Sequence, residues 1–180
     1  QWQKAIGGGD FDEANKIRIT SDGGYVVAGT TFSNDYDVQG SHGLADFWIV
    51  KLTISGAVQW TKTLGGSDYD RATDIQQTND GGYIVGGYTQ SNDGDVSGNH
   101  GDKDAWVVKL NSAGIVEWQK SLGGSEWEDL WSIEKTVDGG YIMAGRSNSN
   151  NGDVSGNHNG SLDYWIVKLD SAGIIEWQKS

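Results

Sequence analysis

Oxygen-bearing side chains at alternating positions mark residues 93–104. Counted from Asp93, they fall at positions one, three, five and twelve, and Gly98 falls at position six. Ca²⁺ prefers roughly six to eight oxygen ligands at about 2.3–2.6 Å. Alternate residues of a tight loop point to one side and glycine permits a sharp reversal, so the spacing predicts a calcium-binding loop.

The loop resembles the calcium loop of EF-hand proteins and the shorter Asp-x-Asp-x-Asp-Gly loops between strands of integrin-type propellers. The resemblance implies side-chain ligands at Asp93, Asp95, Ser97 and Asp104, with a backbone carbonyl ligand from Asn99. The final ligand is Asp where EF-hands carry a bidentate Glu, and no helices are expected beside the loop. We therefore expect weak sites, in the range of about 10⁻⁴–10⁻³ M.

Two related loops occur in the chain, and both depart from the pattern. In the first, Gln39 stands at position five. In the third, Asn151 replaces the first Asp, and an extra residue moves the last Asp one step beyond position twelve. The corresponding calcium ligands are Asp35, Asp37, Asp46, Asn151, Asp153, Ser155 and Asp163.

Hydrogen bonding within the loops is the alternative explanation for these acids. Asp and Asn side chains accept hydrogen bonds from nearby backbone N–H groups without any metal. Asp46, Asp104 and Asp163 each precede a Trp by two residues, where they can fix the start of a strand. Each loop also holds a single His without a second His or Cys nearby, which favours a hydrogen-bonding role over zinc or copper: His42, His100 and His158.

The loops recur because the whole chain is a repeat. Asp-Gly-Gly-Tyr begins at Asp22, Asp80 and Asp138, at a constant spacing of 58 residues. A unit of this length cannot bury its apolar face alone, so neighbouring copies must share a core. In the second copy, period-two patterns and tight Gly turns predict four strands, at 72–78, 83–89, 105–110 and 115–120.

Four antiparallel strands per repeat are typical of a β-propeller blade. The sequence therefore predicts an all-β chain with blades at 7–64, 65–122 and 123–180, and with residues 1–6 as the outer strand of a preceding blade. Propellers typically close with about four to eight blades, so three are too few. We expect part of a longer repeat chain, or a protomer that completes a six-blade ring with a second copy; an open array is the alternative.

An acid–aromatic–acid sequence connects the repeats, at residues 10–12, 68–70 and 126–128. The rings of Phe11, Tyr69 and Trp127 suit a sugar, because an aromatic face stacks on C–H groups while carboxylates accept hydrogen bonds from hydroxyls. Packing between neighbouring repeats explains these rings equally simply. Trp127 and Trp131 occur in the third copy alone, which makes them the best candidates for a specific contact.

Composition narrows the classes of partner. A formal net charge of −12 repels phosphate backbones and anionic lipid, so we expect neither nucleic acid nor membrane partners. No apolar run is long enough to span a bilayer. The acids recur in every copy, as expected of a scaffold, and no nucleophile–base pair, matched carboxylate pair or phosphate loop is evident. We expect no enzyme and no catalytic residue.

Four motifs recur in order: Leu-Gly-Gly-Ser, Asp-Gly-Gly-Tyr-Ile-Val-x-Gly, Asp-x-Trp-Val-Val-Lys-Leu and Gly-x-Val-x-Trp-x-Lys. They resemble the roughly sixty-residue repeats of large secreted bacterial proteins, and the resemblance spans the whole chain. It implies an extracellular or cell-surface location. We therefore expect a non-enzymatic, calcium-stabilised module for binding or adhesion, with a glycan or a surface protein as partner. The alternatives are a structural spacer in a large surface protein or filament, and a fragment of a propeller glycosidase or lyase.

Overall fold

The computed structural model describes residues 1–158 and 161–180, in which twelve β-strands occur. The strands of the second repeat begin and end within two residues of the predicted positions. In chain order the strands are β1 (Asp12–Ile19), β2 (Tyr25–Thr31), β3 (Asp46–Leu52), β4 (Val58–Leu64), β5 (Asp70–Gln77), β6 (Tyr83–Thr89), β7 (Asp104–Leu110), β8 (Val116–Leu122), β9 (Glu128–Lys135), β10 (Tyr141–Ser147), β11 (Asp163–Leu169) and β12 (Ile175–Lys179).

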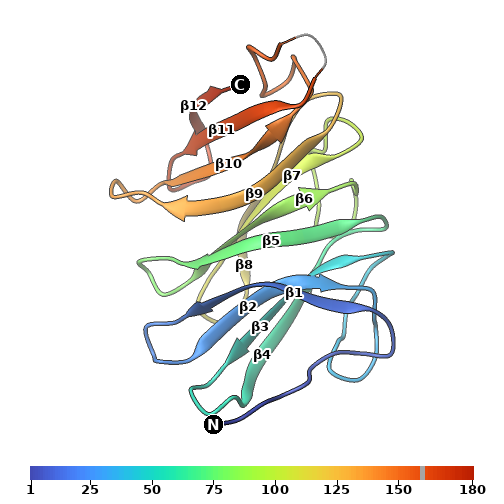
Figure 1. Cartoon of the computed structure of the whole chain (residues 1–180), viewed down its shortest axis with the longest axis vertical. Coiled ribbons are helices and arrows are strands. Elements are labelled where there is room, and N and C mark those ends of the chain that lie inside the picture. The colour runs from blue at the N-terminus through green and yellow to red at the C-terminus, as the bar shows by residue number, and fades with distance from the viewer. Residues whose placement is uncertain (159–160) are drawn as a thin grey trace.

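Each repeat forms one antiparallel sheet in which strands that follow one another in sequence are neighbours, in the orders β1-β2-β3-β4, β5-β6-β7-β8 and β9-β10-β11-β12. Figure 1 shows the three sheets stacked along the long axis, with the two termini at opposite ends. The prediction of an all-β chain is confirmed. The described part of the chain contains no helix, and so none that could cross a membrane. The stack does not close on itself, and its assignment as propeller blades stays a prediction.

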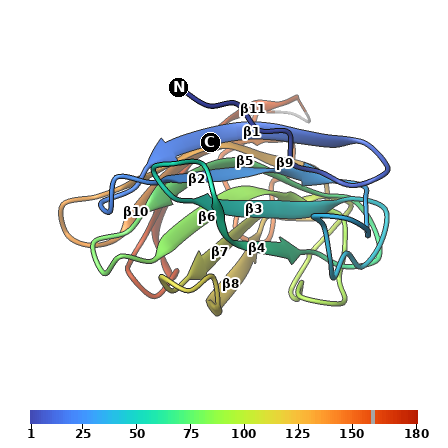
Figure 2. The same ribbon diagram turned by 90° about the horizontal axis from the view of Figure 1, so that it is seen from below.

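The meander order places the long loops and the tight turns at opposite ends of the sheets. Figure 2 shows the order of the strands across the sheets, with β1, β5 and β9 along one side of the stack and β4 and β8 along the other. In each sheet the long loop between the second and third strands lies at the same end as the connection to the next sheet. All three acidic loops therefore share one rim, as the chain direction predicts.

The Asp-Gly-Gly-Tyr motif forms the turn between the first two strands of each sheet. In the second repeat Gly81 has a φ of +84°, a left-handed conformation that glycine adopts without steric cost. Asp80 Oδ1 accepts hydrogen bonds from Gly82 N at 2.9 Å and from Thr78 Oγ1 at 2.5 Å. The acid of the motif therefore stabilises its own turn.

A buried lysine on the third strand completes this turn. Lys109 Nζ donates to Asp80 Oδ2 at 2.9 Å, to Glu117 Oε2 at 2.7 Å and to Leu110 O at 3.1 Å, and the side chain is only 5% exposed. Its three donors are all used, which offsets the cost of burying an ammonium group. The same contact joins Asp22 to Lys51 and Asp138 to Lys168 in the other repeats.

The apolar core lies between the sheets rather than within any one of them. Between the first two sheets, Phe47 packs against Trp106 with ring centroids 4.6 Å apart, and Ile49 is fully buried. Trp106, Val108 and Leu110 occupy alternate positions of β7 and therefore share one face, and all three belong to this core. A second core with equivalent residues joins the second and third sheets. The middle sheet is therefore covered on both faces.

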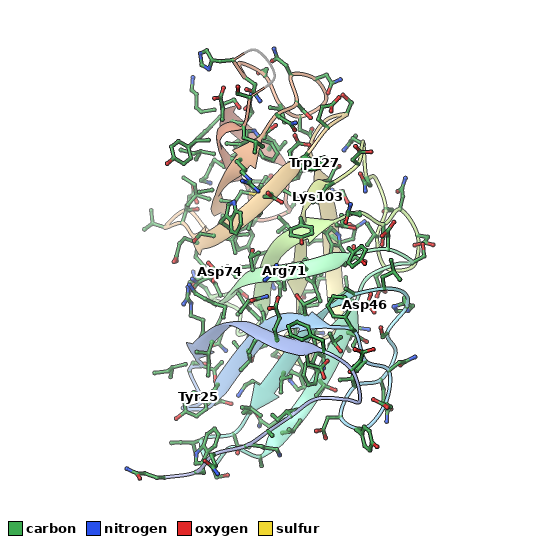
Figure 3. The ribbon with its side chains drawn as sticks, turned by 45° about the vertical axis from the view of Figure 1, so that its right-hand side comes forward. Tyr25, Asp46, Arg71, Asp74, Lys103 and Trp127 are labelled. Atoms are coloured by element: carbon green, nitrogen blue, oxygen red, sulfur yellow. The ribbon has the colours of Figure 1, made fainter. Side chains whose placement is uncertain are left out.

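One carboxylate connects the first strands of all three sheets. Asp74 on β5 is fully buried and accepts hydrogen bonds from Arg18 Nη2, Ser132 Oγ and Ile133 N, each at 3.1 Å. Lys16 Nζ lies 3.8 Å from the same carboxylate. Figure 3 shows Asp74 on β5, between β1 and β9. These contacts hold the three sheets in register along the edge formed by β1, β5 and β9.

The turn contacts make part of the stability dependent on pH. The hydrogen bond from Thr78, and then the Lys109 ammonium, lower the pKa of Asp80 to about 2. A carboxyl whose pKa is lower when folded stabilises the protein above its unfolded pKa of about 3.9, and this contribution is lost as the pH falls towards 2. We expect Asp80→Asn to unfold with a shallower pH dependence between pH 4 and 2, measured by urea denaturation. Equal slopes for the variant and the wild type would contradict this account.

Removing the Asp74 carboxylate should destabilise the whole stack. Asp74→Ala leaves Ser132 Oγ, Ile133 N and Arg18 without their acceptor, so we expect the free energy of unfolding to fall by about 3 kcal/mol. The control is Asp102→Ala, in an exposed part of the β6–β7 loop, with an expected change of no more than about 0.5 kcal/mol. A loss below about 1 kcal/mol for Asp74→Ala in urea denaturation would rule out this linking role.

Candidate functional site

The first acids of each long loop bind backbone N–H groups at the entry to the same sheet. In the second repeat, Asp93 accepts a hydrogen bond from Ser67 N at 2.7 Å and Asp95 accepts one from Gly65 N at 3.4 Å. The hydrogen bond from Ser67 also lowers the pKa of Asp93. Equivalent bonds are made by Asp35 with Gly9 N (2.6 Å), Asp37 with Gly7 N (3.3 Å), Asn151 with Ser125 N (2.9 Å) and Asp153 with Gly123 N (3.2 Å).

The next predicted calcium ligands point to other partners. Ser97 Oγ accepts a hydrogen bond from Gln119 Nε2 on β8 at 2.6 Å, and Ser155 Oγ accepts one from Gln178 Nε2 on β12 at 2.6 Å. Asn99 Nδ2 donates to Ser91 O at 3.0 Å. These loops thus contain hydrogen bonds of the kind expected if their polar side chains stabilise the loops without a metal. In residues 1–158 and 161–180, no three His, Asp or Glu side chains form a group that could hold a metal ion.

Asp46 and Asp104, the last predicted ligands of the first two loops, behave differently, because one oxygen of each has no donor in the described part of the chain. Asp46 and Asp104 are fully buried, and their Oδ2 atoms accept hydrogen bonds from His42 N at 2.7 Å and His100 N at 2.9 Å. Their Oδ1 atoms have no hydrogen-bond partner among the described residues. Burial raises the pKa of both carboxyls. In the third loop the hydrogen bond from His158 N to Asp163, 2.7 Å long, lowers the pKa of Asp163.

A second buried acid from the next sheet lies beside each of these free oxygens. A Cβ placed on Gly65 would overlap Asp46 Oδ1 and lie 2.6 Å from Asp70 Oδ2. At the next junction, a Cβ on Gly123 would overlap Glu128 Oε2 and lie 2.7 Å from Asp104 Oδ1. Glycine is therefore required at Gly65 and Gly123, in the connections between the sheets, because two carboxylates converge on each of these positions.

Asp70 and Glu128 are the last residues of two acid–aromatic–acid connections, whose carboxylates would accept hydrogen bonds from sugar hydroxyls in one of the two explanations of this motif. Both are fully buried. Asp70 accepts hydrogen bonds from Gly66 N at 2.7 Å and Ser91 Oγ at 2.9 Å, and Glu128 accepts them from Gly124 N at 2.8 Å and Ser147 Oγ at 2.6 Å. Burial raises the pKa of Asp70 to about 6. These carboxylates bind the backbone of the connections between the sheets, and they cannot reach a sugar hydroxyl on the surface.

The loops contain a further capping residue that the sequence analysis did not identify. An Asn near the start of each loop accepts a hydrogen bond from the glycine six residues later: Asn34 from Gly40 N (3.1 Å), Asn92 from Gly98 N (3.2 Å) and Asn150 from Gly156 N (3.1 Å). The recurrence of these Asn residues at the repeat spacing of 58 was the signal that could have found them.

The predicted ligand-binding aromatics lie on the loop rim and are about half exposed. The exposed fractions are 57% for Phe11, 43% for Tyr69 and 49% for Trp127. Phe32 contacts both Phe11 and Tyr69, with ring centroids 5.8 and 6.2 Å apart. Lys103 Nζ lies 5.3 Å from the Trp127 ring centroid. These rings therefore pack against neighbouring side chains and still leave a face in solvent.

A cavity of about 370 Å³ opens beside β5 and β9, and Trp131 forms part of its wall. The Trp131 ring is 57% exposed, and the Arg146 guanidinium lies 5.4 Å from its centroid. Arg71, Tyr88 and Lys103 line the same cavity. Figure 3 labels Arg71 and Lys103, with Trp127 beyond them. The third-copy Trp131 and the basic residues thus meet in one place, whereas Phe11, Tyr69 and Trp127 do not line it.

The cavity carries more positive than negative groups. Arg71 Nη2 pairs with Glu13 at 2.6 Å, while Lys103 Nζ and Arg146 Nη2 both pair with Asp129, at 2.5 and 2.6 Å. Three cations thus face two carboxylates, in a chain whose net charge is −12. No local motif marks this cluster in the sequence, because its residues come from different repeats. Comparing the copies position by position would have shown that Arg146 and Asp129 belong to the third alone.

Comparisons with known proteins leave the family of this chain open. No family model and no curated protein matches it. Among solved structures, a protein of unknown function from Bacteroides caccae is similar at 16% sequence identity with a TM-score of 0.33. The match covers 93% of this chain, which spans 66% of that protein.

Proposed function

We propose that this chain is a non-enzymatic binding module whose cavity beside β5 and β9 takes an acidic glycan. The observation that carries the proposal is the meeting of an exposed Trp131 ring with Arg71, Lys103 and Arg146 around a cavity of about 370 Å³. Binding pockets commonly combine apolar and aromatic walls with a few well-placed polar groups.

The aromatic ring and the cations have separate roles in this proposal. The exposed face of Trp131 stacks on the C–H face of a sugar ring. Arg71 and Arg146 keep 44% and 42% of their side chains exposed, so each has donors directed to solvent besides those paired with Glu13 and Asp129. A guanidinium binds a carboxylate in a bidentate manner, which favours a uronic or other acidic sugar over a neutral one.

The surrounding sheets serve as a rigid support in this proposal. The sheets are taken as propeller-type blades of an extracellular or cell-surface bacterial protein, in which the rim of long loops and the cavity face a partner. Support comes from the three equivalent sheets and from the Asp74 contacts that join their first strands. A site built on packed strands is better positioned for adhesion than one on loops alone.

A glycan array that includes neutral, uronate-containing and sialylated oligosaccharides tests the proposed site. We expect the 180-residue chain to bind acidic members, with Trp131→Ala reducing affinity at least about tenfold because it removes the stacking face. Arg71→Gln should reduce binding to acidic sugars more than to neutral ones. Trp127→Ala should have a smaller effect, because Trp127 does not line the cavity and contacts it only through Lys103.

Tyr36→Ala is the matched control, because Tyr36 is 80% exposed and lies in the β2–β3 loop, away from the cavity lining. Its binding profile should equal that of the wild type. Absence of binding across the array, or equal binding by Trp131→Ala and the wild type, would remove the glycan site and leave the structural spacer as the better account.

We also propose that calcium stabilises the loop rim. The support is a buried Oδ1 atom at each of two junctions, on Asp46 and on Asp104, that has no donor among residues 1–158 and 161–180. Asp46 Oδ1 lies near the Asp70 carboxylate, and Asp104 Oδ1 lies near that of Glu128. A bound cation would relieve the repulsion between these acids. The loop residues Asp93, Asp95 and Ser97 are engaged elsewhere, so a ligand set centred on the free oxygens fits better than the set implied by the EF-hand resemblance.

Thermal unfolding with and without a chelator tests the calcium proposal. We expect EDTA to lower Tm, and about 5 mM Ca²⁺, above the affinity range of weak extracellular sites, to restore it by mass action. Asp104→Asn should reduce the response to calcium, whereas Asp102→Asn in the exposed part of the loop should keep it. Identical melting curves in EDTA and in calcium would exclude this site.

A further inference from the structure

The last sheet exposes a face that is buried in the other two. On β11, Tyr164 is 87% exposed and Ile166 is 38% exposed. The equivalent residues of the first sheet, Phe47 and Ile49, are fully buried against the second sheet. In the second sheet the same positions are also fully buried, against the third. The free face of the last sheet therefore has the chemistry of an inter-sheet junction.

The first sheet has the opposite, complementary face free. Ile17 is 57% exposed, whereas the equivalent Ile75 and Ile133 are fully buried under the preceding sheet. A cavity of about 270 Å³ lies on this face, lined mainly by apolar side chains that include Ile17, Trp48 and Val50. At the internal junction, the position equivalent to Trp48 is Trp106, which is covered by Phe47.

The N-terminal segment covers part of this face. Trp2 packs edge-on against Tyr25 at 5.9 Å, as Trp60 packs on Tyr83 at 5.6 Å and Trp118 on Tyr141 at 6.0 Å. Ile6 packs against the small apolar cluster of the first sheet in the place that Leu64 takes at the next junction. Residues 1–6 form no strand and supply no equivalent of Phe47 or Ile49, so the cavity stays open.

We propose that a second copy of this chain docks head-to-tail, with its β11 face on the first sheet. Tyr164 of one copy would enter the cavity over Trp48 of the other, as Phe47 lies on Trp106. Trp177, which is 44% exposed, would take the place of Trp2 on Tyr25. Trp2 and Trp177 cannot pack on Tyr25 at the same time. The segment 1–6 therefore leaves the face of the first sheet when the second copy binds.

The second copy is the occupant because the two internal junctions already show the fit. The docking face of β11 and the first sheet are the same two surfaces that meet twice within the chain, with equivalent residues. The acids at the junction are equivalent as well, since Asp163 and Asp12 occupy the positions of Asp46 and Asp70, whose carboxylates converge at Gly65. Such a heterologous contact gives a closed ring where the rotation closes and a longer assembly where it does not.

Sedimentation equilibrium of the 180-residue chain at up to roughly 100 µM, above the micromolar limit of standard interfaces, tests the docking. We expect association by the wild type. Tyr164→Lys and Ile17→Asp should each lower it more than about tenfold, because each places a charge in the apolar junction. Tyr36→Lys is the control, since it makes the same change at an exposed tyrosine of the β2–β3 loop. Circular dichroism melts confirm that each variant folds.

A mixture of the two blocked variants separates this contact from a symmetric one. The Tyr164→Lys chain keeps an intact first sheet, and the Ile17→Asp chain keeps an intact β11 face. Mixing them should restore a single-contact dimer that neither forms alone. A wild type that stays monomeric, association that ignores both substitutions, or a mixture that fails to associate would each overturn the proposal.

Trp2→Ala tests the displacement of the N-terminal segment. Removing the competing ring should raise the association constant about two- to tenfold, the equivalent of one aromatic pair. Trp177→Ala should lower it by a similar factor. An unchanged or weaker association of Trp2→Ala would contradict the competition between Trp2 and Trp177. It would show that the segment 1–6 does not hinder docking on the first sheet.

Discussion

Burial between neighbouring sheets is the interaction on which this molecule depends. A single four-stranded sheet has two faces, and here a face is fully covered by apolar side chains only where another sheet packs on it. The middle sheet has another sheet packed on both of its faces, while each outer sheet has another sheet packed on one face. The polar contacts follow the same rule, because Asp74 and the carboxylates at Gly65 and Gly123 link groups of different sheets. Stability is therefore cooperative along the stack, as in other repeat arrays.

The sequence predicted most of the fold because the relevant signals are local. The period of Asp-Gly-Gly-Tyr, the tight glycine turns and the alternation around Trp106 each report on a few neighbouring residues. Strand positions and the single rim of long loops followed from them. The number of sheets in a completed assembly is a different question, since it depends on the angle between sheets and not on any local pattern.

The site was harder to predict because it depends on residues far apart in the chain. The spacing of Asp93, Asp95 and Ser97 matched a calcium loop, yet their oxygens are used by Ser67, Gly65 and Gln119. The burial of Asp70 and Glu128 arises only when the next sheet is in place. Trp131 was identified from its singularity within the repeat. Its basic neighbours come from two other strands and from the β6–β7 loop, and no spacing rule connects them.

The Asp-Gly-Gly-Tyr turn also bears on how relatives of this protein should be sought. Its acid and its glycines are fully accounted for by the turn itself and by the buried lysine, as in Asp80 and Lys109. A profile dominated by this motif retrieves chains that share an architecture, whatever they recognise. Under the proposed function, changes in ligand choice should instead appear at the positions of Arg71, Trp131 and Arg146, which differ among the three copies. Related chains are therefore best grouped by the residues that they carry at those three positions.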